Sequence, residues 1–319
     1  MRVSIAGSMN ALPHPMSAEK EPTKRHELVE LADRLAPLQG YNPTPLHGVR
    51  ILRAETVLHD VPVLYKPGAV FVLQGRKRGM LEGEVYLYDE EHYLAVSVPV
   101  PFRMESVASP ERPLLAVYVE FDMRLAAEIV SEVDMRPSDS SVGKMRGLVS
   151  SRMEPDIEDV LLRLLRTLHD PVELAVLGAG ILRELHYRVL VGPQGGAMIS
   201  ALRQRGTSGR IVQSLTRLRE NYGSRISVAA LASEAGMSVP SFHVHFKALT
   251  GSTPIQYVKA MRLHEARLMI ARQDKTIAEV AASVGYASPA QFSRDFKRHF
   301  RRTASEEAGW VRQHLGELA

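Results

Sequence analysis

The 319-residue sequence contains no cysteine and only one tryptophan. The missing cysteine excludes disulfides, thiolate metal ligands, cysteine nucleophiles and a repair-type methyl acceptor, and it suits a reducing compartment. No segment approaches the roughly 20 consecutive apolar residues that a membrane helix needs. Residues 1–16 also lack the apolar core of a secretory signal. We therefore expect a cytoplasmic protein with no membrane partner.

Signatures of catalysis are missing as well. No Gly-x-Ser-x-Gly elbow occurs, and the glycine-rich residues 192–196 lack the Lys-Ser/Thr ending of a phosphate loop. His47, His59 and His92 stand singly, and each is more simply a surface or core histidine than a metal ligand. The pair in residues 243–245 has one residue between its two histidines, but on a helix such neighbours diverge. We predict no enzyme, no metal site and no cofactor.

Charge is unevenly distributed along the chain. Residues 210–319 hold 16 Lys+Arg and 9 Asp+Glu, whereas the whole chain has 40 and 36. The C-terminal third is therefore basic and the remainder slightly acidic. Such asymmetry is typical of a chain with one end facing a polyanion, although a solvated basic surface is an equally good interpretation of charge alone.

The pattern of polar and apolar residues changes twice in the first half of the chain. Residues 1–25 are polar and proline-rich, which predicts a disordered tail. Leucines at helical spacing predict a helix from Glu27 that ends at Pro37 and Gly40. Between Leu46 and Phe121, short apolar runs are separated by proline and glycine, which predicts a β-barrel or sandwich. The predicted strands include residues 49–52, 70–73, 85–88, 94–98 and 114–119.

After Phe121 the pattern becomes helical. One apolar stripe runs from Ile157 to Leu168, and a second runs from Leu174 to Val189. Together they predict a helical hairpin that either packs on its own barrel or forms a dimer interface. Residues 204–209 are short, polar and glycine-containing, which favours a linker between domains 26–203 and 210–319.

The region after this linker contains an internal repeat at an offset of 50 residues. Each copy has a short helix, a glycine (Gly236 or Gly285) and then a serine (Ser238 or Ser288) that can cap the next helix. This order is the signature of a helix-turn-helix unit. Seven residues are identical between the copies, namely Ala232, Ser233, Ser238, Phe242, Phe246, Lys247 and Thr253, which match Ala282, Ser283, Ser288, Phe292, Phe296, Lys297 and Thr303.

The second helix of each copy has two unlike faces. Its phenylalanines lie four residues apart and must be buried, whereas the opposite face carries polar side chains. A plain helical bundle with solvated charges would also have helices with polar outer faces. It would not show the internal repeat. Residues 253–271 between the copies predict one helix about 28 Å long, with Pro254 at its first position. This helix is long enough to hold both recognition helices on one side of a DNA duplex.

Two segments of this region resemble the signature of AraC-type transcription regulators. They are residues 261–270 (MRLHEARLMI) and 284–298 (VGYASPAQFSRDFKR), and the resemblance extends from about Arg210 to Trp310. It implies that the outward side of each second helix contacts the major groove of double-stranded DNA. The implied contact residues are Pro240, His243, Val244 and Lys247, then Ala290, Gln291, Ser293, Arg294, Lys297 and Arg298.

The residue types suggest separate roles on the DNA. Arg294 suits bidentate pairing with guanine, and Gln291 with adenine. Lys247, Lys297 and Arg298 suit phosphates, which position a protein without reading sequence. The second copy departs from the family pattern after its recognition helix, because Arg301 and Ala304 replace the usual glycine and proline. This difference puts the shape of that turn in doubt.

The N-terminal half resembles the domain that accompanies one branch of these regulators. The resemblance rests on residues 41–46, 74–78, 92–94 and 108–113. It implies a cupin-like barrel followed by helices, with a role in effector sensing and dimerisation. Enzymatic cupins carry a His-x-His pair with a Glu and a later His, and the barrel region has no such set. The expected fold class is α+β, with an N-terminal cupin-like barrel and hairpin and a C-terminal all-α double helix-turn-helix domain.

We thus expect a sequence-specific transcriptional regulator that responds to a small-molecule effector and acts on double-stranded DNA. As an activator it would also contact RNA polymerase, and it could form a homodimer. A catalytic or ligand-binding barrel that uses the DNA-binding module for localisation is one alternative, against which the missing His-x-His argues. A non-specific architectural DNA binder is another, but its reading faces would need mainly Lys and Arg. The effector, its pocket residues, the operator and the sign of regulation do not follow from the sequence.

Overall fold

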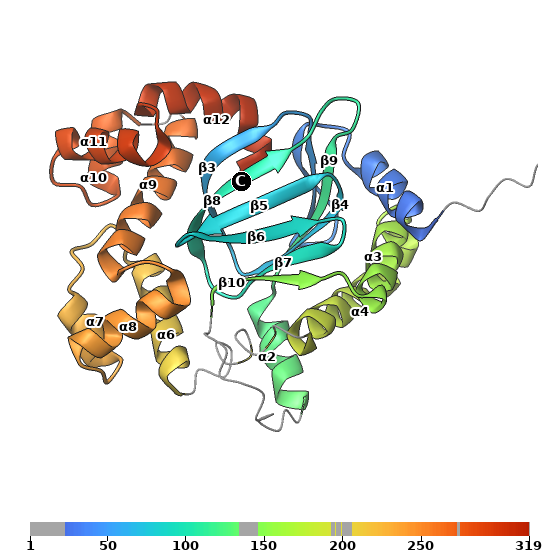
Figure 1. The fold of residues 1–319 in the computed structure, drawn as a ribbon, viewed down its shortest axis with the longest axis horizontal. Coiled ribbons are helices and arrows are strands. Elements are labelled where there is room, and N and C mark those ends of the chain that lie inside the picture. Colours follow the sequence, from blue (N-terminus) through green and yellow to red (C-terminus); the bar gives the residue numbers. More distant parts are fainter. Residues whose placement is uncertain are drawn as a thin grey trace, which may run out of the picture.

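The computed structural model describes residues 23–133, 146–192, 195, 199, 206–272 and 275–318. Strands gather in the first half and helices in the last third, which confirms the α+β class (Figure 1). Most of the predicted tail (1–22) lies outside the described residues, and helix α1 (Lys24–Leu35) begins three residues before the predicted Glu27. Leu38, which the leucine spacing included in this helix, follows it and is 70% exposed.

Two antiparallel sheets form the N-terminal domain and enclose an apolar interior, and we call this pair of sheets the barrel. The larger sheet has the order β1-β2-β9-β4-β7-β10, and the smaller has β3-β8-β5-β6. The strands of the larger sheet are β1 (Gly40–Pro43), β2 (Val49–Ala54), β4 (Gly68–Gln74), β7 (His92–Val96), β9 (Leu114–Glu120) and β10 (Leu148–Arg152). The smaller sheet contains β3 (Leu58–Tyr65), β5 (Arg76–Leu81), β6 (Glu84–Asp89) and β8 (Val100–Val107).

The five predicted strands correspond to β2, β4, β6, β7 and β9. The other five were not named from the sequence pattern, and two of them, β5 and β3, contain residues that are unusual in a buried strand. Strand β5 begins Arg76-Lys77-Arg78, yet Lys77 points inward and is only 1% exposed. Strand β3 contains Pro62, which is tolerated because β3 is the edge strand of its sheet.

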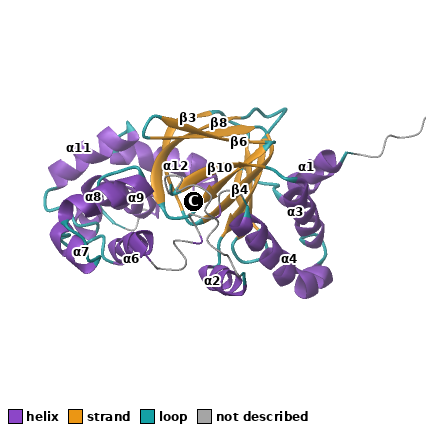
Figure 2. Cartoon of the chain, turned by 60° about the horizontal axis from the view of Figure 1, so that its bottom comes forward, coloured by secondary structure: helices purple, strands orange, loops and turns teal. Residues whose placement is uncertain are grey.

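Four helices cover the outer face of the larger sheet, on the side away from the C-terminal helices (Figures 1 and 2). They are α1, α2 (Met123–Glu132), α3 (Pro155–Thr167) and α4 (Pro171–Val191). Helices α3 and α4 confirm the predicted hairpin. Buried residues of all four helices share one apolar core with this sheet. The sequence had predicted only helices after Phe121, so the strand β10 corrects that expectation.

Seven helices make up the described C-terminal part. They are α6 (Gly206–Glu220), α7 (Val228–Glu234), α8 (Val239–Thr250), α9 (Pro254–Arg272), α10 (Ile277–Ser283), α11 (Pro289–Phe300) and α12 (Ala304–Leu318). The predicted linker 204–209 therefore needs correction, because residues 206–209 already belong to α6. Residues 204 and 205 lie outside the described residues.

The C-terminal helices dock on the barrel rather than standing apart from it. One apolar core is continuous from the barrel interior through α6, α7, α8 and the first half of α9. The second helix-turn-helix unit has a core of its own, formed with the second half of α9 and with α12. Among the described residues, no helix is both long and apolar enough to cross a membrane.

Candidate DNA-binding site

The first predicted helix-turn-helix unit is present as α7, a turn and α8. Gly236 in the turn has φ of +61°, a left-handed conformation that favours glycine. Ser238 caps α8, because its hydroxyl accepts a hydrogen bond from the Ser241 amide at 3.3 Å. Phe242 and Phe246 are fully buried, so α8 turns its apolar side inward and its opposite side outward.

The second unit repeats this geometry in α10, a turn and α11. Gly285 takes φ of +82° in the turn, and the Ser288 hydroxyl accepts from the Gln291 amide at 3.3 Å. Phe292 and Phe296 are fully buried. Thr276 and Glu279 add a capping box to α10, and hydrogen bonds from Thr276 hold the pKa of the Glu279 carboxyl below its usual range. The predicted repeat is thus a structural repeat.

The turn after each recognition helix has the same shape despite the change in sequence. Gly251 after α8 has φ of +69°, and Arg301 after α11 has φ of +62°. The sequence had put the shape of the second turn in doubt, and the structure shows that it matches the first turn. The turn keeps its left-handed residue, and the arginine side chain bears a conformational cost that glycine avoids.

A single helix joins the two units, as predicted. Helix α9 spans 19 residues and begins with Pro254. Arg262 on α9 fixes the geometry around it with three hydrogen bonds to backbone carbonyls, at 2.7 Å to Tyr222, 2.7 Å to Ser224 and 3.0 Å to Gly285. One side chain thus ties the loop before the first unit to the turn of the second.

The predicted contact residues lie on the outward sides of α8 and α11. His243 is half-buried, and the others are exposed, with Val244 at 66%. The exposed members are Pro240, Val244, Lys247, Ala290, Gln291, Ser293, Arg294, Lys297 and Arg298. Their placement gives two separate surfaces, one on α8 that mixes apolar and polar side chains and a mainly polar one on α11.

Some of these side chains already have partners within the protein. Lys247 Nζ lies 3.0 Å from the Glu82 carboxylate of the barrel. The Ser293 hydroxyl donates to the Pro289 carbonyl at 3.0 Å, and Arg298 forms an ion pair with Asp295. Asp295 had not been predicted as a functional residue. It is 7% exposed and also lies 3.5 Å from Lys259 Nζ, so it orders the cations beside the reading face of α11.

The interface between the barrel and the first unit contains specific polar contacts. The Gly147 amide donates to the Leu249 carbonyl in the last turn of α8 at 2.8 Å. The hydroxyl of Tyr257, fully buried on α9, donates to the Pro99 carbonyl at 3.0 Å. Because these bonds satisfy buried groups, they fix the orientation of the first unit on the barrel.

A buried ion pair fixes the second unit. Arg267 of α9 and Glu307 of α12 are 5% and 1% exposed, and their side chains approach to 2.8 Å. Arg267 also donates to the Pro62 carbonyl of β3 at 3.1 Å. Burial lowers the pKa of Arg267 to about 10, and the neighbouring Glu307 carboxylate opposes that shift.

A cavity of about 650 Å³ lies between the barrel and the C-terminal helices. Its barrel wall contains the rings of Tyr41, Tyr65 and Tyr118 in edge-to-face contact. The Arg50 guanidinium lies 4.6 Å and 4.8 Å from the centres of the Tyr41 and Tyr118 rings. Burial raises the pKa of Tyr65 to about 12, so its hydroxyl stays protonated at neutral pH.

The cavity is richer in cationic than in anionic side chains. Its lining was not predicted, because it comes from strands and helices far apart in the sequence and carries no local signal. The charged lining residues are Arg50, Lys66, Arg219, Arg267 and Arg272 against Glu220 and Glu265. Apolar atoms are supplied by Val63, Leu64, Pro99, Met261, Leu268 and Val311.

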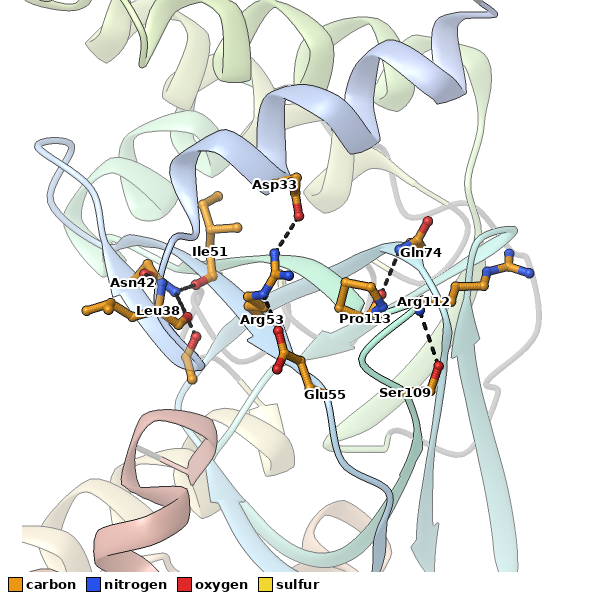
Figure 3. A network of polar contacts seen from close by, with 11 residues as sticks. Asp33, Leu38, Asn42, Ile51, Arg53, Glu55, Gln74, Ser109, Arg112 and Pro113 are labelled. Carbon is orange, nitrogen blue, oxygen red and sulfur yellow. Dashed lines mark hydrogen bonds and ion pairs between the residues drawn. The ribbon is translucent and has the colours of Figure 1, made fainter.

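The motif residues of the N-terminal resemblance instead build a polar network beside α1 (Figure 3). Asn42 is 4% exposed and donates to the Leu38 carbonyl at 2.7 Å, and it accepts from the Leu38 amide at 3.0 Å. Gln74 donates to the Pro113 carbonyl at 2.8 Å, and Ser109 accepts from the Arg112 amide at 3.2 Å. These side chains hold turns and strand ends in place. Among the described residues, no group of three or more His, Asp or Glu could hold a metal ion.

Two family models match separate parts of the chain. The AraC-type transcriptional regulator N-terminus matches residues 45–197, and a helix-turn-helix domain matches residues 231–308. Together they span most of the chain. The chain belongs to the AraC-type transcriptional regulators.

Curated relatives of this AraC-type chain are similar mainly in one region. The RCS-specific transcriptional activator RclR of Escherichia coli is 36% identical over 105 residues, which is 33% of this chain and 36% of RclR. The probable transcriptional regulator LumQ of Photobacterium leiognathi is 37% identical over 81 residues, or 25% and 33% of the two chains. The similarity thus covers only about a third of these relatives' own length.

Solved structures extend the similarity in fold to most of the chain. ToxT of Vibrio cholerae O395, bound to a methylnaphthalenyl-butenoic acid, has a TM-score of 0.55 at 13% identity, covering 82% of this chain and 98% of ToxT. A ToxT structure with an unsaturated fatty acid bound has a TM-score of 0.51 at 12% identity, covering 85% and 97%. At this identity the likeness shows a shared fold.

Proposed function

We propose that this AraC-type chain binds DNA sequence-specifically through α8 and α11 and thereby regulates transcription. The observation that supports it best is the repeated geometry of these two helices. Each is N-capped, buries its phenylalanines and exposes polar side chains, and α9 holds both units. Helices of this kind fit the major groove, and 19 residues span about 28 Å, close to one turn of the duplex.

Within this proposal, Arg294 and Gln291 read bases, whereas Lys247 and Lys297 contact phosphates. Arg294 and Gln291 are exposed side by side on one surface of α11 and match the donor pattern for guanine and adenine. Arg298 is held by Asp295, so it reaches a phosphate without turning toward the bases. Pro240 and Val244 give α8 an apolar surface suited to thymine methyl groups.

Binding-site selection with the purified chain on random duplexes, at low and at moderate salt, tests this function. We expect enrichment of one motif with two elements about one helical turn apart. Binding without enrichment that collapses as salt rises would mean backbone contacts alone and would contradict sequence-specific regulation.

The cavity between the domains is the proposed effector site. Its volume of about 650 Å³ falls in the range of about 300–1,000 Å³ that is usual for small-molecule sites. Its tyrosines, apolar side chains and excess of arginines favour an organic acid with an apolar body, and ToxT binds compounds of that class. Both domains contribute to the wall, so an occupant would alter how the helix-turn-helix units sit on the barrel.

Calorimetric titration with oleate and with an aryl carboxylate tests the effector site. Arg219→Gln removes a cation from the cavity and should weaken binding of the acid about tenfold if the two charges meet. Arg217→Gln, two residues earlier on α6 and outside this cavity, is the matched control. Equal affinity in wild type and Arg219→Gln would place the effector elsewhere.

Helix α4 is the proposed dimer contact, though not through its predicted stripe. Ile181, Leu185 and Val189 of that stripe pack inside their own domain. The opposite side of α4 exposes Val172 and Val176 at 74% each. A second copy of the chain would cover this apolar surface.

Light scattering after size exclusion of the full chain tests the dimer. Val172→Glu/Val176→Glu should yield monomers because each interface would gain four charges. Val107→Glu, at a position 61% exposed on β8, is the control and should stay dimeric. A wild-type monomer would contradict this part of the proposal.

The remaining expectations follow the family. A regulator that binds DNA acts in the cytoplasm and needs no catalytic role. RclR is described as a transcriptional activator, and an activator of this kind would also contact RNA polymerase.

A further inference from the structure

The barrel places an acidic hairpin tip against the first recognition helix. Residues 81–84, here called the hairpin tip, connect β5 to β6 and point toward the C-terminal helices (Figure 1). Glu82 and Gly83 have φ of +52° and +82°, so the turn has a defined left-handed shape. The carboxylate of Glu82 lies 3.0 Å from Lys247 Nζ on α8.

Neighbouring contacts hold the hairpin tip and the end of α8 together. Leu81 packs against the turn after α8, where a Cβ at Gly251 would lie 2.7 Å from the leucine side chain. The Gly147 amide donates to the Leu249 carbonyl at 2.8 Å. Glu84, the other acid of the tip, forms an ion pair with Arg146 beside Gly147. The position of Glu82 is therefore set by the packing around it.

The two recognition helices differ in this respect. Lys247 and Lys297 occupy equivalent positions of the repeat and are both expected to contact phosphate. Among the ion pairs of the described residues, Lys247 reaches a carboxylate of the barrel, and Lys297 reaches none. The barrel touches α11 through Arg103, which donates to the His299 carbonyl at 3.4 Å, in the last turn of α11 and beside Arg298.

We propose that Glu82 takes the place of a DNA phosphate at Lys247, so that the barrel partly masks the first recognition helix in the DNA-free protein. This inference rests on the DNA-binding function proposed above. When a duplex binds α8, a phosphate has to replace the Glu82 carboxylate at Lys247. Other phosphates of the duplex then lie close to the acidic side chain of Glu82. The mask therefore lowers the affinity of the first unit and leaves the second unit unaffected.

Fluorescence anisotropy of a labelled random-sequence duplex at low salt tests the mask, because Lys247 is expected to contact phosphate in any sequence. Glu82→Gln in the full chain should tighten binding about 2- to 5-fold, as expected for loss of an exposed ion pair that opposes DNA. Glu55→Gln is the matched control. It removes the same charge from an ion pair with Arg53. Arg53 also pairs with Asp33 of α1, so this control site lies beside α1, on the other side of the barrel from α8 (Figure 3).

A double-mutant cycle separates the mask from general electrostatics. In a Lys247→Gln chain, Glu82→Gln should change the affinity no more than Glu55→Gln does. Equal effects of Glu82→Gln and Glu55→Gln in the chain with Lys247 would overturn the mask while leaving DNA binding intact. A wild-type chain that binds no duplex would overturn the DNA-binding function itself, and the mask with it.

Discussion

The two helix-turn-helix units have nearly the same geometry but different surroundings. Phe242 and Phe246 of the first unit belong to a core that continues into the barrel, whereas Phe292 and Phe296 of the second belong to a separate core. The repeat determines the shape of each unit. Which unit responds to the barrel is determined by what each one packs against.

The largest effects should come from the phenylalanines that distinguish the two cores. Phe246→Ala and Phe296→Ala should each cost about 3–5 kcal/mol of local stability, since both rings are fully buried. The first change should lower the stability of the barrel as well, because the core is shared. Hydrogen exchange measured by mass spectrometry checks this difference. Equal loss of protection in β8 for both variants would contradict the division into two cores.

A second prediction concerns the buried ion pair between Arg267 of α9 and Glu307 of α12, beside the second unit. Glu307→Gln should lower the free energy of unfolding by about 3 kcal/mol, because Arg267 stays buried beside a neutral partner. Urea denaturation measures this change. Arg267→Met/Glu307→Leu removes both charges and should recover most of the loss, and no recovery would mean that the pair itself stabilises the junction.

A third prediction follows from the histidines near this pair. His264 Nε2 and His299 Nε2 lie 3.4 Å apart. Burial, with the charges of Arg103 and Arg267 nearby, lowers the pKa of His299 to about 4, and burial holds the pKa of His264 well below its usual value. The unfolded chain therefore binds more protons than the folded one between about pH 6.5 and pH 4, so stability is full above that window and is lost as pH falls through it.

The expected loss from His299 is about 1–2 kcal/mol between about pH 7 and pH 5, the upper figure being that for a fully buried ring. Urea denaturation at both pH values measures it. His299→Gln cannot take up the proton and should show a smaller pH effect. A pH dependence identical to that of wild type would assign the effect to other groups.

Much of this comparison could be predicted from the sequence, and some could not. The repeat predicted both units, their caps and the helix between them, because these features depend on residues close together in the chain. Strand β5 could not be predicted because it contains Lys77, and a lysine is not expected to be buried. In the structure the Lys77 ammonium donates to the Tyr65 hydroxyl at 3.2 Å, which a sequence pattern does not record. The cavity and the Glu82–Lys247 contact join residues more than a hundred positions apart, and no local pattern records them.

The smallest effect on stability is expected in the turn after the recognition helix, where the two copies of the repeat differ in sequence. Arg301 holds the left-handed position that Gly251 holds in the first unit. Arg301→Gly should stabilise the second unit by about 0.5–1 kcal/mol, because relief of the backbone cost exceeds the added entropy of glycine in the unfolded chain. Gly251→Ala should destabilise the first unit by more than that. Thermal denaturation compares the two, and loss of stability in Arg301→Gly would contradict a strained turn.

The most direct test of the central claim is binding-site selection with Arg294→Ala beside the wild-type chain. If α8 and α11 read separate elements, the variant should lose preference at one base position, worth about 1–3 kcal/mol, in one element only. The other element should be enriched as before. Uniform weakening across all sequences, with no position relaxed, would show that Arg294 touches only the backbone and would contradict base reading by α11.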